Sequence, residues 1–246
     1  MNYEDFIQNI KFRRIDPMMG TISLSAEISS LEELINAKAF INKIDQQLAI
    51  LPEKQDEYLK ILSPILDIPR MSTFAVAAII SRTVREIAQD TAYVNIGTWH
   101  GYTLLAGMLG NEQKKVVGID NFSKFGGPRD HARNIFEQFK GDNHFFYDMD
   151  YREYFSNFHE GKIGFYFYDG EHSYKNQIEG LRVAEKYFTP DSIVMVDDTN
   201  WEDPRRATLD FISESPNKYK IILDCRTAWN GHPTFWNGII VFKRVA

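Results

Sequence analysis

The sequence after residue 90 alternates between short apolar runs and amphipathic stretches, a pattern typical of βαβ units. The predicted strands span residues 92–96, 115–119, 144–147, 164–168, 192–196, 218–224 and 238–243. The predicted helices between the first six strands span residues 102–109, 128–138, 152–158, 174–187 and 205–213. The pattern therefore predicts an α/β fold with a Rossmann-like, doubly wound sheet of seven strands. Because the loop 225–237 joins the last two strands without a helix, we expect a mostly parallel sheet with an antiparallel C-terminal strand.

The first ninety residues have a different and mostly helical pattern. Ser30 and Glu33 form a capping-box pattern, which predicts a helix over residues 30–51. Further helices are predicted over residues 56–62 and 72–89. The chain is therefore expected to divide into a helical N-terminal extension, 1–90, and a second domain, 91–246. We expect the extension to act as a lid over the strand ends or as the contact of a homo-oligomer; the alternative is that it completes the helical layer.

The composition limits the classes of partner that this chain can bind. A net charge of −6 argues against a nucleic-acid partner, because nucleic-acid affinity depends on a basic protein surface. The single cysteine, Cys225, excludes an intrachain disulfide and a multi-cysteine zinc site. No apolar run approaches the roughly 20 residues of a membrane helix, and residues 1–14 do not resemble a secretory signal. The sequence therefore predicts a soluble, cytoplasmic protein whose partner is a small molecule.

Two glycines, Gly97 and Gly101, lie between the first predicted strand and the helix that follows it. Glycine lets the backbone turn sharply and approach a ligand closely. Asp120 ends the second predicted strand about 20 residues further on, where an acid can accept ribose hydroxyls. These residues together favour a nucleoside-bearing cofactor, and the alternative is a structural turn and a helix cap. An NAD-dependent oxidoreductase fits less well, because the spacing is GxxxG rather than GxGxxG.

Acidic residues follow the fourth and fifth predicted strands, at Asp169, Asp197 and Asp198. If these strands are neighbours, the three carboxylates lie at one edge of the sheet and repel one another unless a cation or protons intervene. Oxygen ligands of this kind suit Mg²⁺. His172 or Glu171 is then placed to act as a general base beside the metal. The alternative is that the acids only cap helices.

The order of these motifs resembles the class I S-adenosylmethionine-dependent methyltransferases. The motifs are NxGxxxGxT from residue 95, GID from 118, DGEHSY from 169 and IVMVDD from 193, followed by a strand hairpin. The resemblance covers residues 93–244 and is to the branch of catechol-type and macrocin-type O-methyltransferases. It implies that S-adenosylmethionine is the cofactor and that the protein is an enzyme, a methyltransferase.

The resemblance also implies roles for individual residues. The implied cofactor-binding residues are Asn95, Gly97, Thr98, Gly101, Asp120, Met149, Asp150 and Asp169. Among these, Asn95 stands where an acid is usual in the family, and Met149 and Asp150 fall on the turn that approaches the adenine. The implied ligands of a Mg²⁺ ion are Asp169, Asp197 and Asp198. The base corresponds to His172 in catechol-type members and to Glu171 in macrocin-type members, and we favour His172.

The function expected from these residues is Mg²⁺-assisted methyl transfer to a hydroxyl of a small molecule. The acceptor is expected to be a sugar, a polyketide-like molecule or a phenol. The alternatives are a non-catalytic or metal-independent protein that retains the methyltransferase fold, and the less favoured NAD-dependent oxidoreductase.

Overall fold

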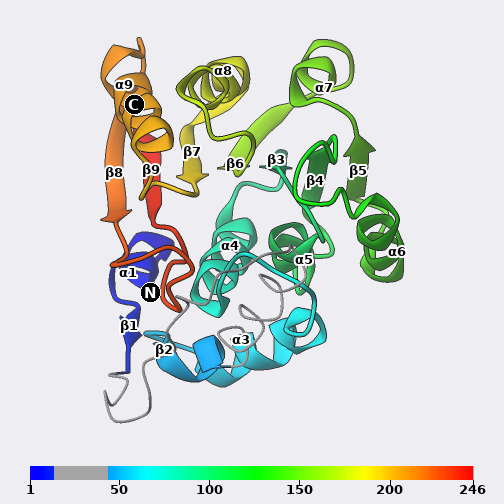
Figure 1. Ribbon diagram of the computed structural model, residues 1–246, viewed down its shortest axis with the longest axis vertical. Helices are drawn as coiled ribbons and strands as arrows, with labels where there is room; N and C mark the ends of the chain where they lie inside the picture. The colour runs from blue at the N-terminus through cyan, green and yellow to red at the C-terminus, as the bar shows by residue number, and fades with distance from the viewer. Residues whose placement is uncertain (14–43, 246) are drawn as a thin grey trace.

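The largest element of the computed structural model, which describes residues 1–13 and 44–245, is a sheet of seven strands (Figure 1). The strands are β3 (Thr91–Ile96), β4 (Lys115–Asp120), β5 (His144–Asp148), β6 (Lys162–Tyr168), β7 (Phe188–Val196), β8 (Lys218–Cys225) and β9 (Ile239–Val245). Their order in the sheet is β5-β4-β3-β6-β7-β9-β8. The pairs among β3 to β7 are parallel, and β9 is antiparallel to both of its neighbours. The predicted doubly wound α/β sheet is confirmed.

The C-terminal hairpin enters the sheet in an order that the sequence did not predict. The antiparallel pairing of β8 with β9 was expected and is present. However, β9 lies between β7 and β8, so the last strand of the chain is interior and β8 forms the edge. The loop between these strands therefore returns to the carboxyl end of β7.

Helices cover both faces of the sheet (Figure 1). The helices after β3 are α5 (Tyr102–Met108), α6 (Arg129–Phe139), α7 (Tyr151–Asn157), α8 (Tyr174–Glu185) and α9 (Glu202–Glu214). On β6 the side chains alternate between the two faces, as expected for a strand. Phe165 and Phe167 belong to the core on the side of α5, whereas Tyr166 and Tyr168 belong to the core under α7, α8 and α9. The sheet is therefore buried on both faces, which explains why its strands read as nearly continuous apolar runs.

The N-terminal segment consists of α1 (Tyr3–Gln8), β1 (Lys11–Phe12), β2 (Ala49–Ile50), α3 (Gln55–Leu62), a 3₁₀ turn η1 (Ser63–Ile65) and α4 (Phe74–Glu86). The helices predicted over residues 56–62 and 72–89 are confirmed as α3 and α4. The helix predicted over residues 30–51 lies mostly outside the described residues. In its described part, residues 44–48 are helical as predicted. Only the predicted end at residue 51 is wrong, because Ala49 and Ile50 pair with β1 as a short antiparallel strand. Backbone pairing with a distant segment overrides the local helical pattern here.

Helix α4 is part of the layer that covers the sheet. Its residues Phe74 to Val84 are buried, and they share one hydrophobic cluster with α5 and with Phe165 of the sheet. Whether the N-terminal extension also serves as a lid or an oligomer contact, and whether residue 90 is a domain boundary, stay predictions. In the part of the chain that the structure describes, no helix is long and apolar enough to cross a membrane.

Candidate active site

The carboxyl ends of four parallel strands bring the predicted site residues to one edge of the sheet. Ile96 of β3 is in register with Ile119 of β4 and with Tyr168 of β6, and Tyr168 is in register with Val196 of β7. The residue after each of these positions is therefore a neighbour of the others: Gly97, Asp120, Asp169 and Asp197. The strand order reverses between β3 and β6, which is where open α/β sheets bind ligands.

Gly97 allows the loop after β3 to touch the loop after β6. A Cβ atom at this position would lie 1.8 Å from the backbone oxygen of Asp169, and its φ of +77° is one that other residues rarely adopt. The backbone N–H of Asp169 donates to the Ile96 carbonyl at 2.9 Å, which holds the two loops together. The candidate cofactor loop and the first candidate metal ligand are therefore in direct backbone contact.

Asn95 supports the glycine loop from inside the core. Its side chain is fully buried, accepts a hydrogen bond from Thr103 Oγ1 at 2.9 Å and donates to the Gly97 carbonyl at 3.2 Å. Gly101, with a φ of +95°, begins α5 at the other end of the loop. An amide meets both of these bonds because it donates and accepts at once, which an ionised acid cannot do. This accounts for an asparagine, rather than an acid, at position 95.

The Asp120 carboxylate is already bonded to the backbone. Its Oδ2 accepts from the N–H groups of Thr98 at 2.8 Å and Trp99 at 2.7 Å, and its Oδ1 accepts from the Phe122 N–H at 2.7 Å. The Thr98 hydroxyl also donates to Oδ2, at 3.4 Å. Each carboxylate oxygen offers about two acceptor positions, so the position left for a ribose hydroxyl is on Oδ1. Asp120 therefore fixes the glycine loop, and a second ribose bond requires that one of these N–H groups be displaced.

The turn predicted to approach an adenine lies beside Asp120. The Met149 N–H donates to the Asp120 carbonyl at 3.1 Å. The Asp150 side chain begins α7 by accepting from the Arg152 N–H at 2.8 Å, and it pairs with the Arg152 guanidinium at 3.3 Å. Asp150 thus has a structural partner, while Met149 is partly buried next to the candidate ribose site.

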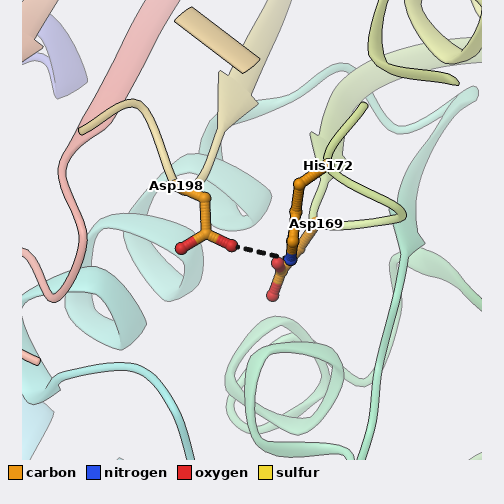
Figure 2. Close-up of side chains that lie close together, drawn as sticks. All are labelled: Asp169, His172 and Asp198. Atoms are coloured by element: carbon orange, nitrogen blue, oxygen red, sulfur yellow. Dashed lines mark ion pairs between the residues drawn. The ribbon is translucent and has the colours of Figure 1, made fainter. Parts of the chain in front are cut away.

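Three side chains with metal-binding atoms converge beyond the glycine loop, as Figure 2 shows. One ligand atom from each of Asp169, His172 and Asp198 lies within 4.8 Å of the others. His172 Nε2 lies 3.0 Å from Asp198 Oδ2. Burial raises the pKa of Asp169 well above its usual value, and the carboxylates of Asp197 and Asp198 raise it further. The group therefore carries negative charge that a proton or a cation would stabilise.

Asp197 does not belong to this group of three. It is 3% exposed, and its Oδ1 accepts from the Asp198 N–H at 2.8 Å. Burial, followed by the charge of Asp198, raises the pKa of Asp197 well above its usual value. The three side chains that lie close together are thus Asp169, His172 and Asp198, and the predicted ligand set of Asp169, Asp197 and Asp198 stays a prediction. A direct role of Asp197 stays a prediction.

The two candidate bases differ in how they are held. Glu171 is exposed and accepts hydrogen bonds from the Ser173 hydroxyl at 2.7 Å and from the Asn176 side chain, and the Ser173 bond lowers the pKa of Glu171. In a neutral His172, donation from Nε2 to Asp198 leaves Nδ1 as the basic nitrogen. A carboxylate that orients an imidazole in this way is a common arrangement for a general base.

Several residues around His172 were not identified from the sequence. The Trp201 ring lies edge-on to the His172 ring, with 4.8 Å between the two ring centroids. The centroid of the Phe125 ring lies 6.4 Å from that of the His172 ring. Both aromatic side chains are exposed, at 36% and 45%. Asn237 donates from Nδ2 to Asp198 Oδ1 at 2.5 Å. Exposed aromatic residues in strand-end loops are a weak signal, and nothing local marks Asn237.

The donor set fits a divalent cation. The chemistry of Asp169 and Asp198 is that of hard oxygen ligands, which suit Mg²⁺ and Mn²⁺. Burial, followed by the charges of Asp197 and Asp198, raises the pKa of Asp169, so a cation held here would stabilise its charged form. The glycine loop and Asp120 provide the backbone cradle and the acid that a nucleoside-bearing cofactor requires.

Comparisons with known proteins agree with this geometry. Residues 94–199 match the model of a protein family described as "Methyltransferase domain". No curated protein matches the sequence significantly.

Among solved structures, the fold is similar to that of an O-methyltransferase from Bacillus cereus in complex with SAH, with 14% identity, a TM-score of 0.53, and coverage of 87% of this chain and 100% of that chain. A "putative caffeoyl-CoA O-methyltransferase" from Staphylococcus aureus has 11% identity, a TM-score of 0.55, and coverage of 84% and 98%. A "putative rRNA-methylase" from Clostridium thermocellum has 10% identity, a TM-score of 0.53, and coverage of 70% and 96%.

These three structures share the fold with this chain, and two of them bear names that point to different acceptors, so the fold does not identify the acceptor. The matched segment of 94–199 contains the glycine loop, Asp120, Asp169, His172 and Asp198. Residues 94–199 are therefore similar to a methyltransferase domain, and the sheet that contains them has the fold of the solved methyltransferases described above.

Proposed function

We propose that this protein transfers a methyl group from S-adenosylmethionine to a hydroxyl of a small molecule with the help of a divalent cation. The observation that carries the proposal is the convergence of Asp169, His172 and Asp198 directly beside the glycine loop. Because the Asp169 backbone touches Gly97, a methyl donor on the loop and an acceptor at the three side chains would be neighbours. Such proximity is what an in-line displacement needs.

Each residue of the candidate site would have a distinct role in this reaction. The loop from Gly97 to Gly101, held by Asp120, would bind the methyl donor. Asp169 and Asp198 would hold the cation, which when bound lowers the pKa of a hydroxyl group. His172 would accept the hydroxyl proton at Nδ1 while Asp198 orients its ring. Glu171 is the weaker candidate for the base, because its carboxylate is occupied by Ser173 and Asn176.

The acceptor is proposed to be a small molecule, with a phenol favoured over a sugar or a polyketide-like molecule. Exposed aromatic rings of Trp201 and Phe125 flank His172, and aromatic faces of this kind pack well against a planar acceptor.

The test follows S-adenosylhomocysteine release from S-adenosylmethionine with a panel of phenols and sugars, in Mg²⁺ and in EDTA. We expect release with at least one phenol, its loss in EDTA, and a loss of about 10²–10⁴-fold in His172→Ala, the usual contribution of a general base. Glu171→Gln is the matched control and should retain most of the activity. Full activity in EDTA would leave a metal-independent enzyme, and absence of S-adenosylhomocysteine binding by calorimetry would leave a non-catalytic protein.

A further inference from the structure

The loop between β8 and β9 is bonded to the segment that carries Asp198. The Asn200 N–H donates to the Asn237 carbonyl at 2.7 Å, and the Thr199 N–H donates to the Gly238 carbonyl at 3.2 Å. The Thr227 N–H donates to Asn200 Oδ1 at 2.9 Å. Residues 198–200 are therefore attached along their length to a loop that is distant in sequence.

Asp198 has a left-handed backbone conformation, which is uncommon for a residue other than glycine. Its φ is +59°, in the left-handed region, where a residue other than glycine is stable only if its surroundings hold it. The bonds from the loop after β8 supply that restraint. They hold Asp198 with its side chain toward His172.

The two oxygens of the Asp198 carboxylate have different partners. Oδ2 faces His172 Nε2 at 3.0 Å, while Oδ1 accepts from Asn237 Nδ2 at 2.5 Å. Asn237 is itself fixed, because its Oδ1 accepts from the Gly231 N–H at 2.7 Å and its side chain is 7% exposed. The Asn237 amide thus determines the rotation of the carboxylate about its last bond.

We propose that Asn237 is a positioning residue that orients Asp198 for a divalent cation and thereby connects the loop 226–238 to the candidate metal centre. The inference rests on the proposed function, since it concerns one of the proposed metal ligands. An asparagine suits this role because it donates to Asp198 and accepts from Gly231 at the same time. The bond to a charged acceptor is also of the stronger kind.

The experiment measures Mn²⁺ binding to the metal-free protein by electron paramagnetic resonance, without an acceptor and without turnover. The variants are Asn237→Ala and the matched control Asn230→Ala. Asn230 lies in the same loop and is exposed, and its Oδ1 accepts from Asn200 at 3.2 Å without touching Asp198. We expect at least tenfold weaker Mn²⁺ binding in Asn237→Ala, which is about 1.4 kcal/mol, and a change below about twofold in Asn230→Ala.

Calorimetry with S-adenosylhomocysteine on the same samples separates positioning from a general loss of structure. Positioning predicts that Asn237→Ala loses Mn²⁺ affinity but keeps the affinity of the parent for S-adenosylhomocysteine. Parallel losses of both affinities would mean a structural role and overturn the inference. Unchanged Mn²⁺ affinity in Asn237→Ala, with Asp198→Ala as the variant that loses it, would overturn the inference but leave the proposed function intact. A parent protein that binds no Mn²⁺ would overturn both the metal centre and the inference.

Discussion

Replacing Gly97 by alanine tests the contact between the glycine loop and Asp169. The added methyl group would lie 1.8 Å from the Asp169 backbone oxygen, whereas an ordinary contact at this position needs at least 3.4 Å. The strands β3 and β6 are hydrogen-bonded up to this point, so the methyl group cannot be accommodated by a side-chain rotation. The loops must separate, and the Asp169 carboxylate must move with its backbone.

The expected cost has two parts. A left-handed conformation costs about 1–2 kcal/mol for a residue with a Cβ. Overpacking in a well-packed region costs about 1–3 kcal/mol more. Gly97→Ala should therefore lower the free energy of unfolding by about 2–5 kcal/mol, a large share of the total of about 5–15 kcal/mol that is typical of folded proteins.

Gly161→Ala is the matched control because it separates the two parts. Gly161 has a φ of +92°, precedes β6 at its other end, and has no atom within 4 Å of an added Cβ. It should lose only the conformational part, about 1–2 kcal/mol. Urea unfolding followed by fluorescence gives both free energies. If Gly97→Ala loses no more stability than Gly161→Ala and binds S-adenosylhomocysteine as the parent does, the close contact does not constrain the site and the reasoning is wrong.

Three further predictions concern charged groups. Asp120→Ala should weaken S-adenosylhomocysteine binding roughly tenfold or more. It should also lower the melting temperature, because the N–H groups of Thr98 and Trp99 in the glycine loop lose their acceptor. Equal affinity of mutant and parent in calorimetry would exclude a ribose role for Asp120. Asp198→Ala should remove the rise in melting temperature that Mg²⁺ gives the parent and that EDTA reverses; an equal response in both proteins would exclude the metal. Burial raises the pKa of Asp45, the partner of Arg70, from 3.8 to about 6. The folded state therefore binds a proton at Asp45 more tightly than the unfolded state does. As the pH rises from about 4 to about 6, the free energy of unfolding should fall by up to about 3 kcal/mol. Asp45→Asn should flatten that part of the pH profile of urea unfolding, and an unchanged slope would contradict the assignment.

The sheet could be predicted because a strand that is buried on both faces is a nearly continuous apolar run in the sequence. Each of the seven predicted strands lies within or overlaps a strand of the structure. The strands β1 and β2 could not be predicted, because a strand of two residues has no periodicity. The helix predicted to residue 51 therefore continued through β2. The insertion of β9 between β7 and β8 depends on pairing between distant segments, which local patterns do not encode.

The position of the candidate site could be predicted from the sequence, but the direction of its side chains could be predicted less well. Parallel register places Asp169 and the pair Asp197 and Asp198 at one edge of the sheet, and this follows from where each strand ends. Which of the two neighbouring acids faces His172 does not follow from the strand. It depends on the left-handed backbone of Asp198 and on a bond from Asn237, 39 residues away.

The same distinction separates the residues at the strand ends from the loop 226–238. Strand register fixes where Gly97, Asp120 and Asp169 lie relative to one another at the edge of the sheet. The loop 226–238 is different, because Asn237 bonds to Asp198, and Arg226 and Thr227 bond to Asn200, the residue that precedes Trp201. A substitution in this loop that alters acceptor choice should therefore also alter metal affinity unless the bond from Asn237 to Asp198 is preserved. We expect substitutions at loop positions that do not support this bond, such as Asn230, to leave metal affinity unchanged.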